Sequence, residues 1–217
     1  MGKAEALRLA LDAVLSVTLA PVCAGCSRVL EKPLDGAVCQ ACWDEVSLNT
    51  GTYEGALRNI IHAFKYEGRR SLSSRLGPAL RIAGRHVLQD AACVVPVPLH
   101  PWRRFRRGFN QAADLAAHLG PPVVHALWRV RATPAQAGLS APQRRRNVRG
   151  AFRLSPWLSG RSRKEHIDDH IVVLVDDVRT TGATLAACAD VLDQAGARQI
   201  RTLTLARAEL GRDAATR

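Results

Sequence analysis

The stretch VVLVDDVRTTGATL, residues 172–185, decides the fold class of this chain. It opens with a short apolar run rich in β-branched residues, 171–175, as expected for a strand buried on both faces of a parallel sheet. Asp176 and Asp177 come where this strand should stop, and open α/β sheets hold ligands at the carboxyl ends of their strands. The sequence therefore predicts an α/β fold, with a ligand site at one edge of a central, mostly parallel sheet flanked by helices.

The turn after the two acids has the composition of a phosphate-binding loop. It leads into an apolar-periodic helix, so its backbone N–H groups and the helix dipole face the same point as the acids. Hydroxyls of Thr180, Thr181 and Thr184 can donate to phosphate oxygens, while Gly182 permits close approach of the backbone. Two carboxylates beside such a loop suit vicinal ribose hydroxyls. We predict a site for a phosphorylated sugar; an ordinary capped strand-to-helix turn is the alternative.

Residues 172–184 closely resemble the phosphoribosyl pyrophosphate (PRPP) fingerprint of type I phosphoribosyltransferases. That fingerprint has four apolar residues, two acids, two mostly apolar positions and T-T-G-x-T, and Arg179 is a mild departure from it. In the family the acids bind the ribose 2′ and 3′ hydroxyls, and the loop binds the 5′-phosphate. The PRPP-binding residues implied by this resemblance are Asp176, Asp177, Val178, Arg179, Thr180, Thr181, Gly182, Ala183 and Thr184.

Receiver domains of response regulators are the main competing interpretation, because their first strand also ends in paired acids. A receiver needs a phosphoacceptor Asp on a later strand, well before its own end, and 40 residues follow Asp177 in this sequence. A receiver would also leave the threonine-glycine loop without a role. We therefore expect the phosphoribosyl site.

Length and composition predict a globular protein. The 217 residues suffice for one well-buried domain with a small appendage, and 47% are hydrophobic against 23% charged. No apolar run of about 18 residues occurs, so we expect no transmembrane helix. Arg8 and Asp12 interrupt the N-terminal apolar run, which favours an amphipathic packing helix over a signal peptide, and hence a cytoplasmic protein. The expected apolar face consists of Leu7, Leu11, Val14, Leu15 and Thr18.

The chain is strongly basic, with 31 Lys plus Arg against 19 Asp plus Glu and a net charge of +12. Such a charge favours polyanionic partners. Only four of these cations are lysines, however, and genome base composition alone can produce such a bias toward arginine. Arginines cluster within residues 103–107 and 144–149, and arginine forks suit phosphate.

Four cysteines form two C-x-x-C pairs, Cys23 with Cys26 and Cys39 with Cys42, separated by 12 residues. This spacing is a strong signature of tetrahedral zinc. Reduced thiols or redox dithiols are the alternative, although a redox motif would place one C-x-x-C after a strand of a βαβ unit. Four thiolates leave no open position on the metal. We expect structural zinc, whose binding supplies folding energy.

Other small residues have expected roles in the same part of the chain and in the core. Gly25 and Gly36 should give the backbone around the two C-x-x-C pairs the conformational freedom that tight turns need. Cys93 and Cys188 stand alone in a predicted strand and helix, and we expect both to fill the core.

The remaining apolar patterns predict further helices and strands. A helix over 54–66 should bury Leu57, Ile60, Ile61 and Phe64, and a second helix should follow Gly68. We expect strands over 91–97, 122–127 and 199–206, helices over 110–118 and 183–195, and a surface connector over 160–170. Lys65 could contact a ligand, but a solvated lysine is better supported.

A basic loop, residues 98–111, should follow the strand over 91–97. Its RGF tripeptide looks like the pyrophosphate loop of phosphoribosyltransferases, which makes Arg107 and the Gly108 backbone candidate pyrophosphate contacts. A patch for single-stranded nucleic acid is the alternative for residues 102–106, because aromatic residues alternate there with arginines.

Residues 129–152 form a polar segment long enough to be a mobile lid over the site. Phosphoribosyltransferases carry a flexible loop in this place that closes to exclude water. Arg131 near the start of the segment is a candidate PRPP ligand, as are Arg144 and Asn147 near its end. For each of them a solvated loop position is equally well supported.

Over nearly its whole length the chain resembles the ComF family of phosphoribosyltransferase-like proteins. The order of motifs carries this resemblance: the cysteine pairs, the RGF loop, T-x-x-Q-x-x-L, R-x-x-N-V-R-G-A-F and the PRPP fingerprint. The two middle motifs are marked by Thr133, Gln136, Leu139, Arg144, Asn147 and Phe152. Membership implies a zinc ribbon, over 21–50, and a type I phosphoribosyltransferase domain, over 51–217; the amphipathic helix predicted from the apolar pattern occupies 1–20.

The resemblance also implies a function. Family members are linked to natural DNA uptake, so we expect a protein that binds PRPP, or another phosphoribosyl compound, together with Mg²⁺. It could be a working transferase, and no sequence feature identifies its acceptor or a catalytic residue. The alternative is a non-catalytic accessory protein that binds single-stranded DNA and uses the PRPP site as a sensor or phosphate anchor. DNA-uptake proteins are expected partners.

Overall fold

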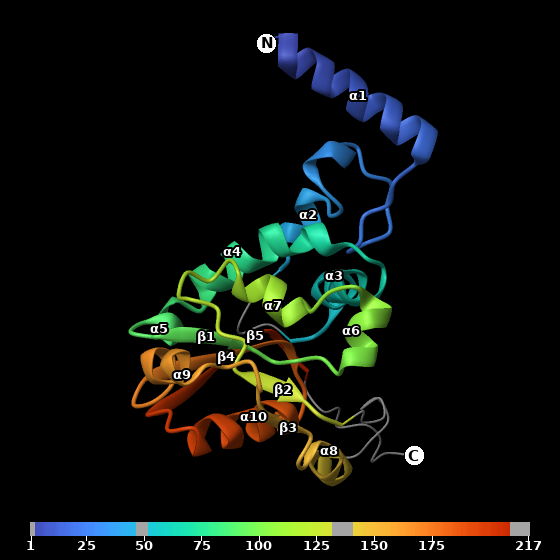
Figure 1. Cartoon of the computed structure of the whole chain (residues 1–217). Coiled ribbons are helices and arrows are strands. Elements are labelled where there is room, and N and C mark those ends of the chain that lie inside the picture. Colours follow the sequence, from blue (N-terminus) through green and yellow to red (C-terminus); the bar gives the residue numbers. More distant parts are fainter. Residues whose placement is uncertain (1–2, 47–51, 132–140, 209–217) are drawn as a thin grey trace, which may run out of the picture. The chain divides into compact units, whose positions relative to one another are not determined.

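The structure is a computed structural model that describes residues 3–46, 52–131 and 141–208 (Figure 1). The chain divides into two compact units, residues 1–47 with 53–72 and residues 48–52 with 73–217. The expected domain limits, 1–20, 21–50 and 51–217, remain predictions. Within the described ranges, every helix is too short or too polar to cross a bilayer.

A three-stranded parallel sheet forms the centre of the second unit, in the order β1-β4-β5. The strands are β1 (Cys93–Pro96), β4 (Ile171–Arg179) and β5 (Gln199–Arg207). Val173 of β4 lies opposite Val94 on one side and Arg201 on the other. Because all three strands run in the same direction, their carboxyl ends meet at a single edge.

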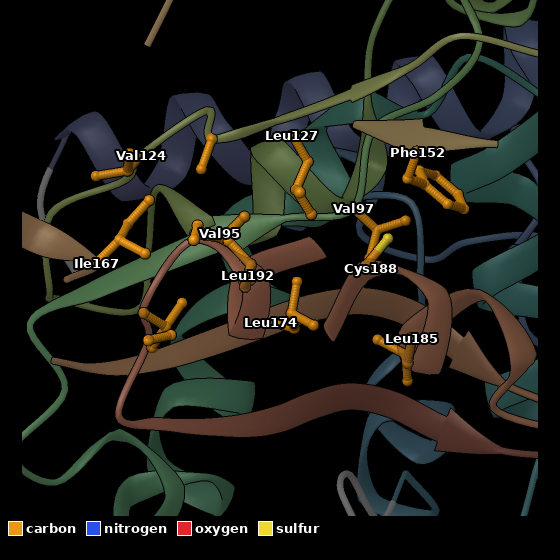
Figure 2. Packing of buried hydrophobic residues seen from close by; sticks show 14 of the residues in the cluster. Val95, Val97, Val124, Leu127, Phe152, Ile167, Leu174, Leu185, Cys188 and Leu192 are labelled. Carbon is orange, nitrogen blue, oxygen red and sulfur yellow. The ribbon is translucent and has the colours of Figure 1, made fainter. Parts of the chain in front are cut away.

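Both faces of this sheet are buried, as the unbroken apolar run of β4 predicted. Val172 and Leu174 belong to the core under α10 (Ala183–Gln194) and the antiparallel pair β2 (Leu127–Arg129) and β3 (Phe152–Leu154). On the opposite face lie α4 (Ser73–Ala83), α5 (Arg85–Leu88) and α7 (Gln111–Ala116). Figure 2 shows the first of these cores, where Cys188 packs among the side chains of both layers. Cys93 and Cys188 are fully buried, which confirms their expected place in the core.

Polar stretches that we expected to be irregular contain helices. The basic loop includes α6 (Pro101–Arg107), the polar segment includes α8 (Ala141–Val148), and the surface connector includes α9 (Gly160–His166). Caps explain two of them: His100 Nδ1 accepts from the N–H of Trp102, and Ser159 Oγ accepts from the N–H of Ser162. Apolar periodicity cannot reveal α6 and α9, because most of their side chains face solvent.

One predicted strand is also wrong in place. Residues 122–127 do not form a continuous strand; Val123 makes an isolated parallel bridge to Val94, and β2 begins only at Leu127. The predicted helix and strand toward the carboxyl terminus are confirmed as α10 and β5, with ends within a residue or two of those expected.

The first unit holds α1 (Lys3–Leu19), η1 (Pro33–Asp35), α2 (Gln40–Asp44), α3 (Gly55–Tyr66) and η2 (Arg70–Leu72). The predicted apolar face of α3 is buried, which confirms that helix. Asn59 of α3 donates from Nδ2 to the carbonyl oxygen of Gly25, 2.8 Å away. This bond joins α3 to the first cysteine pair.

The helix predicted at the N-terminus is present as α1, but the packing expected of it is wrong. Leu7, Leu11 and Val14 are 62%, 47% and 58% exposed. Polar residues make the contacts of α1 instead: Asp12 is buried and accepts from the N–H of Leu34, and Ser16 Oγ donates to the Leu30 carbonyl. Polar bonds, which leave no apolar periodicity in the sequence, therefore fix the orientation of this helix.

The central place of β4 makes Leu174 a test of the sheet core. Leu174 is fully buried between β1, β5 and α10, so Leu174→Ala should lower the free energy of unfolding by ~2–5 kcal/mol in a urea titration followed by tryptophan fluorescence. Ile82→Ala is the control, because the Ile82 side chain on α4 is 74% exposed and should cost under about 0.5 kcal/mol. Equal costs for the two variants would contradict this assignment of the core.

Candidate functional site

The paired acids lie inside β4 rather than after it. The predicted strand end at Val175 is wrong, because β5 continues to pair with β4 through Asp176 opposite Thr204 and Arg179 opposite Arg207. Both acids are half-buried, and Asp176 Oδ1 accepts from the N–H of Asp177 at 2.9 Å. The carboxylates are therefore carried by a hydrogen-bonded strand, which holds them more rigidly than a loop would.

The threonine-glycine loop turns the chain from β4 into α10. Gly182 has a φ of +74°, a left-handed conformation that favours glycine, and it stands at the first turn of the helix. Thr181 Oγ1 accepts from the N–H of Ala183 at 3.3 Å. Residues 180–184 thus curve over the same sheet edge that carries the acids, with Val178 and Arg179 as the last residues of the strand.

The RGF loop connects α6 to α7. Gly108 ends α6 with a φ of +80°, and Asn110 caps α7 through the N–H of Ala112. Arg107 Nη1 donates to Gln111 Oε1 at 2.8 Å, and Gln111 is itself buried. Asn110 Nδ2 donates to the carbonyl oxygen of Val97, which joins this loop to the end of β1.

The parallel register brings the two loops together. Pro96 of β1 lies opposite Val175 of β4, and the N–H of Val97 donates to the Val175 carbonyl at 2.9 Å. The residue after Val175 is the first acid, and Asn110, next to the RGF tripeptide, bonds to Val97, so the RGF loop and the acid pair lie at the same edge of the sheet. Cationic and acidic groups from distant parts of the sequence share this edge.

The segment expected to be a lid spans the ends of the β2–β3 pair. Arg131 is exposed, and its Nη1 donates to the Arg149 carbonyl at 3.2 Å. Asn147 is half-buried on α8, and the structure describes only the backbone of Arg144. Thr133, Gln136 and Leu139 lie outside the described residues. Of the candidate ligands in this segment, the structure therefore places the side chains of Arg131 and Asn147.

Arg129 is a residue of this region that the sequence did not single out. It is 5% exposed on β2, and its guanidinium carbon lies 5.2 Å from the ring centroid of Phe152. Burial lowers the pKa of Arg129, as does the charge of Arg103, while Cys188 and Asp176 act in the opposite direction. A buried cation thus lies within electrostatic reach of the first acid. The sequence around Arg129 carries no signal of its burial, because the residues that enclose it, among them Phe152, are distant in sequence.

The four cysteines of the first unit come together. Their sulfur atoms all lie within 4.8 Å of one another, and the sulfurs of Cys26 and Cys39 are 3.9 Å apart. Tetrahedral zinc with Zn–S bonds of about 2.3 Å places its sulfurs about 3.8 Å apart. The donor set therefore fits a metal ion bound by four thiolates.

Local hydrogen bonds prepare one of these thiols for ionisation. Burial alone would raise the pKa of Cys23, but backbone N–H groups, including those of Cys39 and Gly25, lower it to about 6. Burial and the neighbouring sulfurs raise the pKa of Cys42 far above its ordinary value. A cation bound among the four sulfurs would shift these thiols toward the ionised form.

Gly25 is required because there is no room for a side chain at this position, and not, as expected, because the turn needs its backbone freedom. A Cβ atom on Gly25 would lie 2.7 Å from the sulfur and 2.9 Å from the Cβ of Cys42, closer than real contacts allow. Gly36, with a φ of +126°, does use the freedom expected of glycine. The first cysteine pair therefore needs a residue without a side chain beside Cys42.

Comparison with known proteins gives the family. The family model of the phosphoribosyl transferase domain matches residues 106–215. Competence protein F of Haemophilus influenzae is 36% identical over 176 residues, which cover 76% of this chain and 74% of that protein. The chain belongs to the ComF family.

Two further relatives agree with this membership. DNA utilization protein YhgH of Escherichia coli K12 is 34% identical over 193 residues, covering 84% of this chain and 77% of the relative. Competence protein ComFC of Bacillus subtilis is 28% identical over 211 residues, covering 86% and 84%. The ComF chain thus has the type I phosphoribosyltransferase fold with an N-terminal four-cysteine cluster, which confirms the predicted fold class.

The crowding at Gly25 leads to a prediction about the metal centre of this ComF protein. Gly25→Ala should displace Cys42, so purified variant should hold less metal, and a chelator should remove zinc from it at least tenfold faster. Elemental analysis of the wild type should find about one zinc per chain, as four thiolate ligands require. Ala41→Ser adds an atom at an exposed position of α2 and should behave like wild type.

A folded wild type that holds no metal and exposes four titratable thiols would contradict the assignment. Equal zinc release from Gly25→Ala and Ala41→Ser would contradict the role of Gly25.

Proposed function

We propose that this ComF protein binds PRPP at the carboxyl edge of its sheet. Asp176 and Asp177 hold the ribose hydroxyls, and the loop of residues 178–184 holds the 5′-phosphate. Arg107 and the Gly108 backbone hold the pyrophosphate, with Arg131 as a further ligand from the polar segment. The observation that carries this proposal is the parallel register, which puts the end of β1, to which Asn110 of the RGF loop is bonded, beside the acid pair.

The same edge suits the metal that accompanies PRPP. Two half-buried carboxylates offer the oxygen ligands that Mg²⁺ takes, together with phosphate oxygens of the substrate. When bound, Mg²⁺ supplies positive charge to the pyrophosphate. In the first unit we propose zinc as the metal of the four cysteines, with a structural role, since soft thiolates in a closed set of four suit that ion.

Phosphoribosyl transfer is the reaction that such a complex supports. The bond between ribose C1 and the pyrophosphate oxygen breaks, a bond from C1 to an acceptor forms, and Arg107 stabilises the charge of the departing pyrophosphate. Positioning and electrostatics provide most of the rate of such a reaction. The acceptor is the part of this proposal that no described residue identifies.

Calorimetric titration with PRPP and Mg²⁺ tests the site. Wild type should give saturable, Mg²⁺-dependent binding, and Asp176→Asn/Asp177→Asn should bind at least tenfold more weakly, because hydrogen bonds to charged groups contribute ~1.5–3 kcal/mol each. Asp168→Asn/Asp169→Asn is the matched control, since this second pair of adjacent acids immediately precedes the other end of the same strand.

If wild type releases or absorbs no heat on titration with PRPP and Mg²⁺, the assignment of the PRPP site is wrong. Equal affinity of the two double variants would also contradict it.

A second function rests on a separate observation, the aromatic pair on α6. Trp102 and Phe105 are 62% and 81% exposed, and their rings stack with centroids 6.1 Å apart. Arginines 103, 104 and 106 surround them on the same short helix. We propose that α6 binds single-stranded DNA by stacking on bases and pairing with phosphates, as an accessory activity of a protein whose relatives are named for competence and DNA utilization. DNA-uptake proteins as partners and a cytoplasmic location remain predictions.

Fluorescence anisotropy with labelled oligothymidylate tests this surface. Trp102→Ala/Phe105→Ala should weaken binding roughly tenfold or more, because stacking contributes ~1–3 kcal/mol per base. Trp157→Ala removes an equally exposed aromatic from another place and should have no effect. The logarithm of the affinity should fall linearly with the logarithm of salt concentration. If Trp157→Ala weakens binding as much, α6 is not the DNA surface.

A further inference from the structure

A recess of the phosphoribosyltransferase unit lies at the amino-terminal edge of the sheet, at the end opposite the acids. It has a volume of about 600 Å³ and is lined by residues of α4 and α5 and by the turn of residues 119–121. Gln89, in its wall, precedes β1, and its carbonyl oxygen accepts from Arg201 Nη1 near the start of β5. The turn leads directly to Pro122, whose carbonyl oxygen accepts from the N–H of Val94. β4 alone spans about 26 Å from Ile171 to Arg179 at 3.3 Å per residue, so this recess and the acid pair are separate places.

The charge lining this recess is positive and uncompensated. Arg81, Arg85 and His86 face it, and no acidic residue stands among the described residues that line it. Within the described part of the chain, these three side chains make no ion pair or side-chain hydrogen bond. Other arginines do pair where an acid is near, as Arg161 does with Glu165 at 2.7 Å. Cations gathered without a counter-charge favour an anionic ligand.

The guanidinium of Arg81 lies close to the backbone of the turn at Gly120. Gly120 has a φ of +109°, and a Cβ atom there would lie 3.3 Å from the guanidinium carbon of Arg81. The planar guanidinium therefore rests against the turn, which limits the orientations of its N–H groups. A guanidinium ordered in this way loses less entropy when it forms paired hydrogen bonds with a phosphate.

Apart from Gln89 and Gly120, the rest of the wall is apolar. Leu119 is 1% exposed, Leu88 is 9% exposed, and Pro121 is half-buried beside them. A volume of about 600 Å³ falls within the ~300–1,000 Å³ usual for small-molecule sites, in which apolar walls and a few polar groups combine. A phosphate group can meet the arginines while a flat ring lies against Pro121, which the buried leucines support from behind.

We propose that this recess is a second ligand site, which binds a nucleoside monophosphate. The phosphate pairs with Arg81 and Arg85, His86 donates to it from the same side, and the base lies against Pro121. The site does not depend on PRPP binding at the other edge. Both ligands can be held at once.

Calorimetry with adenosine 5′-monophosphate, without Mg²⁺ or PRPP, tests this site on the whole chain. Arg81→Gln/Arg85→Gln should weaken binding at least tenfold, since each lost hydrogen bond to a charged group corresponds to roughly tenfold or more. Arg149→Gln/Arg153→Gln removes the same charge from exposed positions outside the recess and should bind like wild type. PRPP affinity should be unchanged in Arg81→Gln/Arg85→Gln.

Three results would overturn the proposal. Loss of binding in Thr181→Ala/Thr184→Ala, with none in Arg81→Gln/Arg85→Gln, would place the nucleotide at the carboxyl edge. Inorganic phosphate binding as tightly as the nucleotide would show that the apolar wall takes no part. If wild type binds no nucleotide and Arg81→Gln/Arg85→Gln binds oligothymidylate more weakly, the recess belongs to a surface for single-stranded DNA instead.

Discussion

The pairing of β4 with β1 on one side and β5 on the other is the constraint on which the phosphoribosyltransferase unit depends. Its apolar residues pack into both layers of the core, so one strand joins the two faces of the unit. The same pairing fixes where each strand ends relative to its neighbour. The RGF loop, the acid pair and the threonine-glycine loop therefore meet at the same edge of the sheet. A one-residue slip of β4 would move the acids and turn every buried valine to the opposite face.

The cysteine cluster of the first unit is stabilised by other means than the sheet core. The sheet unit buries large aliphatic side chains in contiguous layers, whereas Cys23, Leu30, Val38 and Cys42 are the main buried apolar groups around the sulfurs of the cysteine cluster. Polar bonds supply further order there: Asp12 and Ser16 fix α1 on the segment of residues 30–34. A small core of this kind needs a cross-link, and four thiolates around one ion can provide it. The exposed leucines of α1 follow from this, since hydrogen bonds rather than apolar contacts orient that helix.

The sequence could predict those elements whose signal lies in consecutive residues, and not those that depend on contacts between distant residues. β4, α10 and the cysteine cluster were predictable, because apolar runs, glycine turns and ligand spacing are all written in consecutive residues. α6 and α9 could not be predicted by periodicity, since caps at His100 and Ser159 start helices whose sides face solvent. Arg129 is harder still: nothing beside it distinguishes a buried arginine from a solvated one. Its environment is created by Phe152, its cross-strand partner, and by β4, which comes more than 40 residues later.

Arg179 shows how a departure from a family pattern is accommodated. The fingerprint usually has a small or aliphatic residue there, and an arginine side chain needs room. Gly182 provides it: a Cβ atom on Gly182 would lie 3.3 Å from Nε of Arg179, so the side chain lies against the bare glycine backbone. The left-handed φ of Gly182 and its lack of a side chain are thus used together, one to turn the chain into α10 and the other to admit the arginine. The result is a cation beside the threonine-glycine loop, where a phosphate would be favoured by charge as well as by hydrogen bonds.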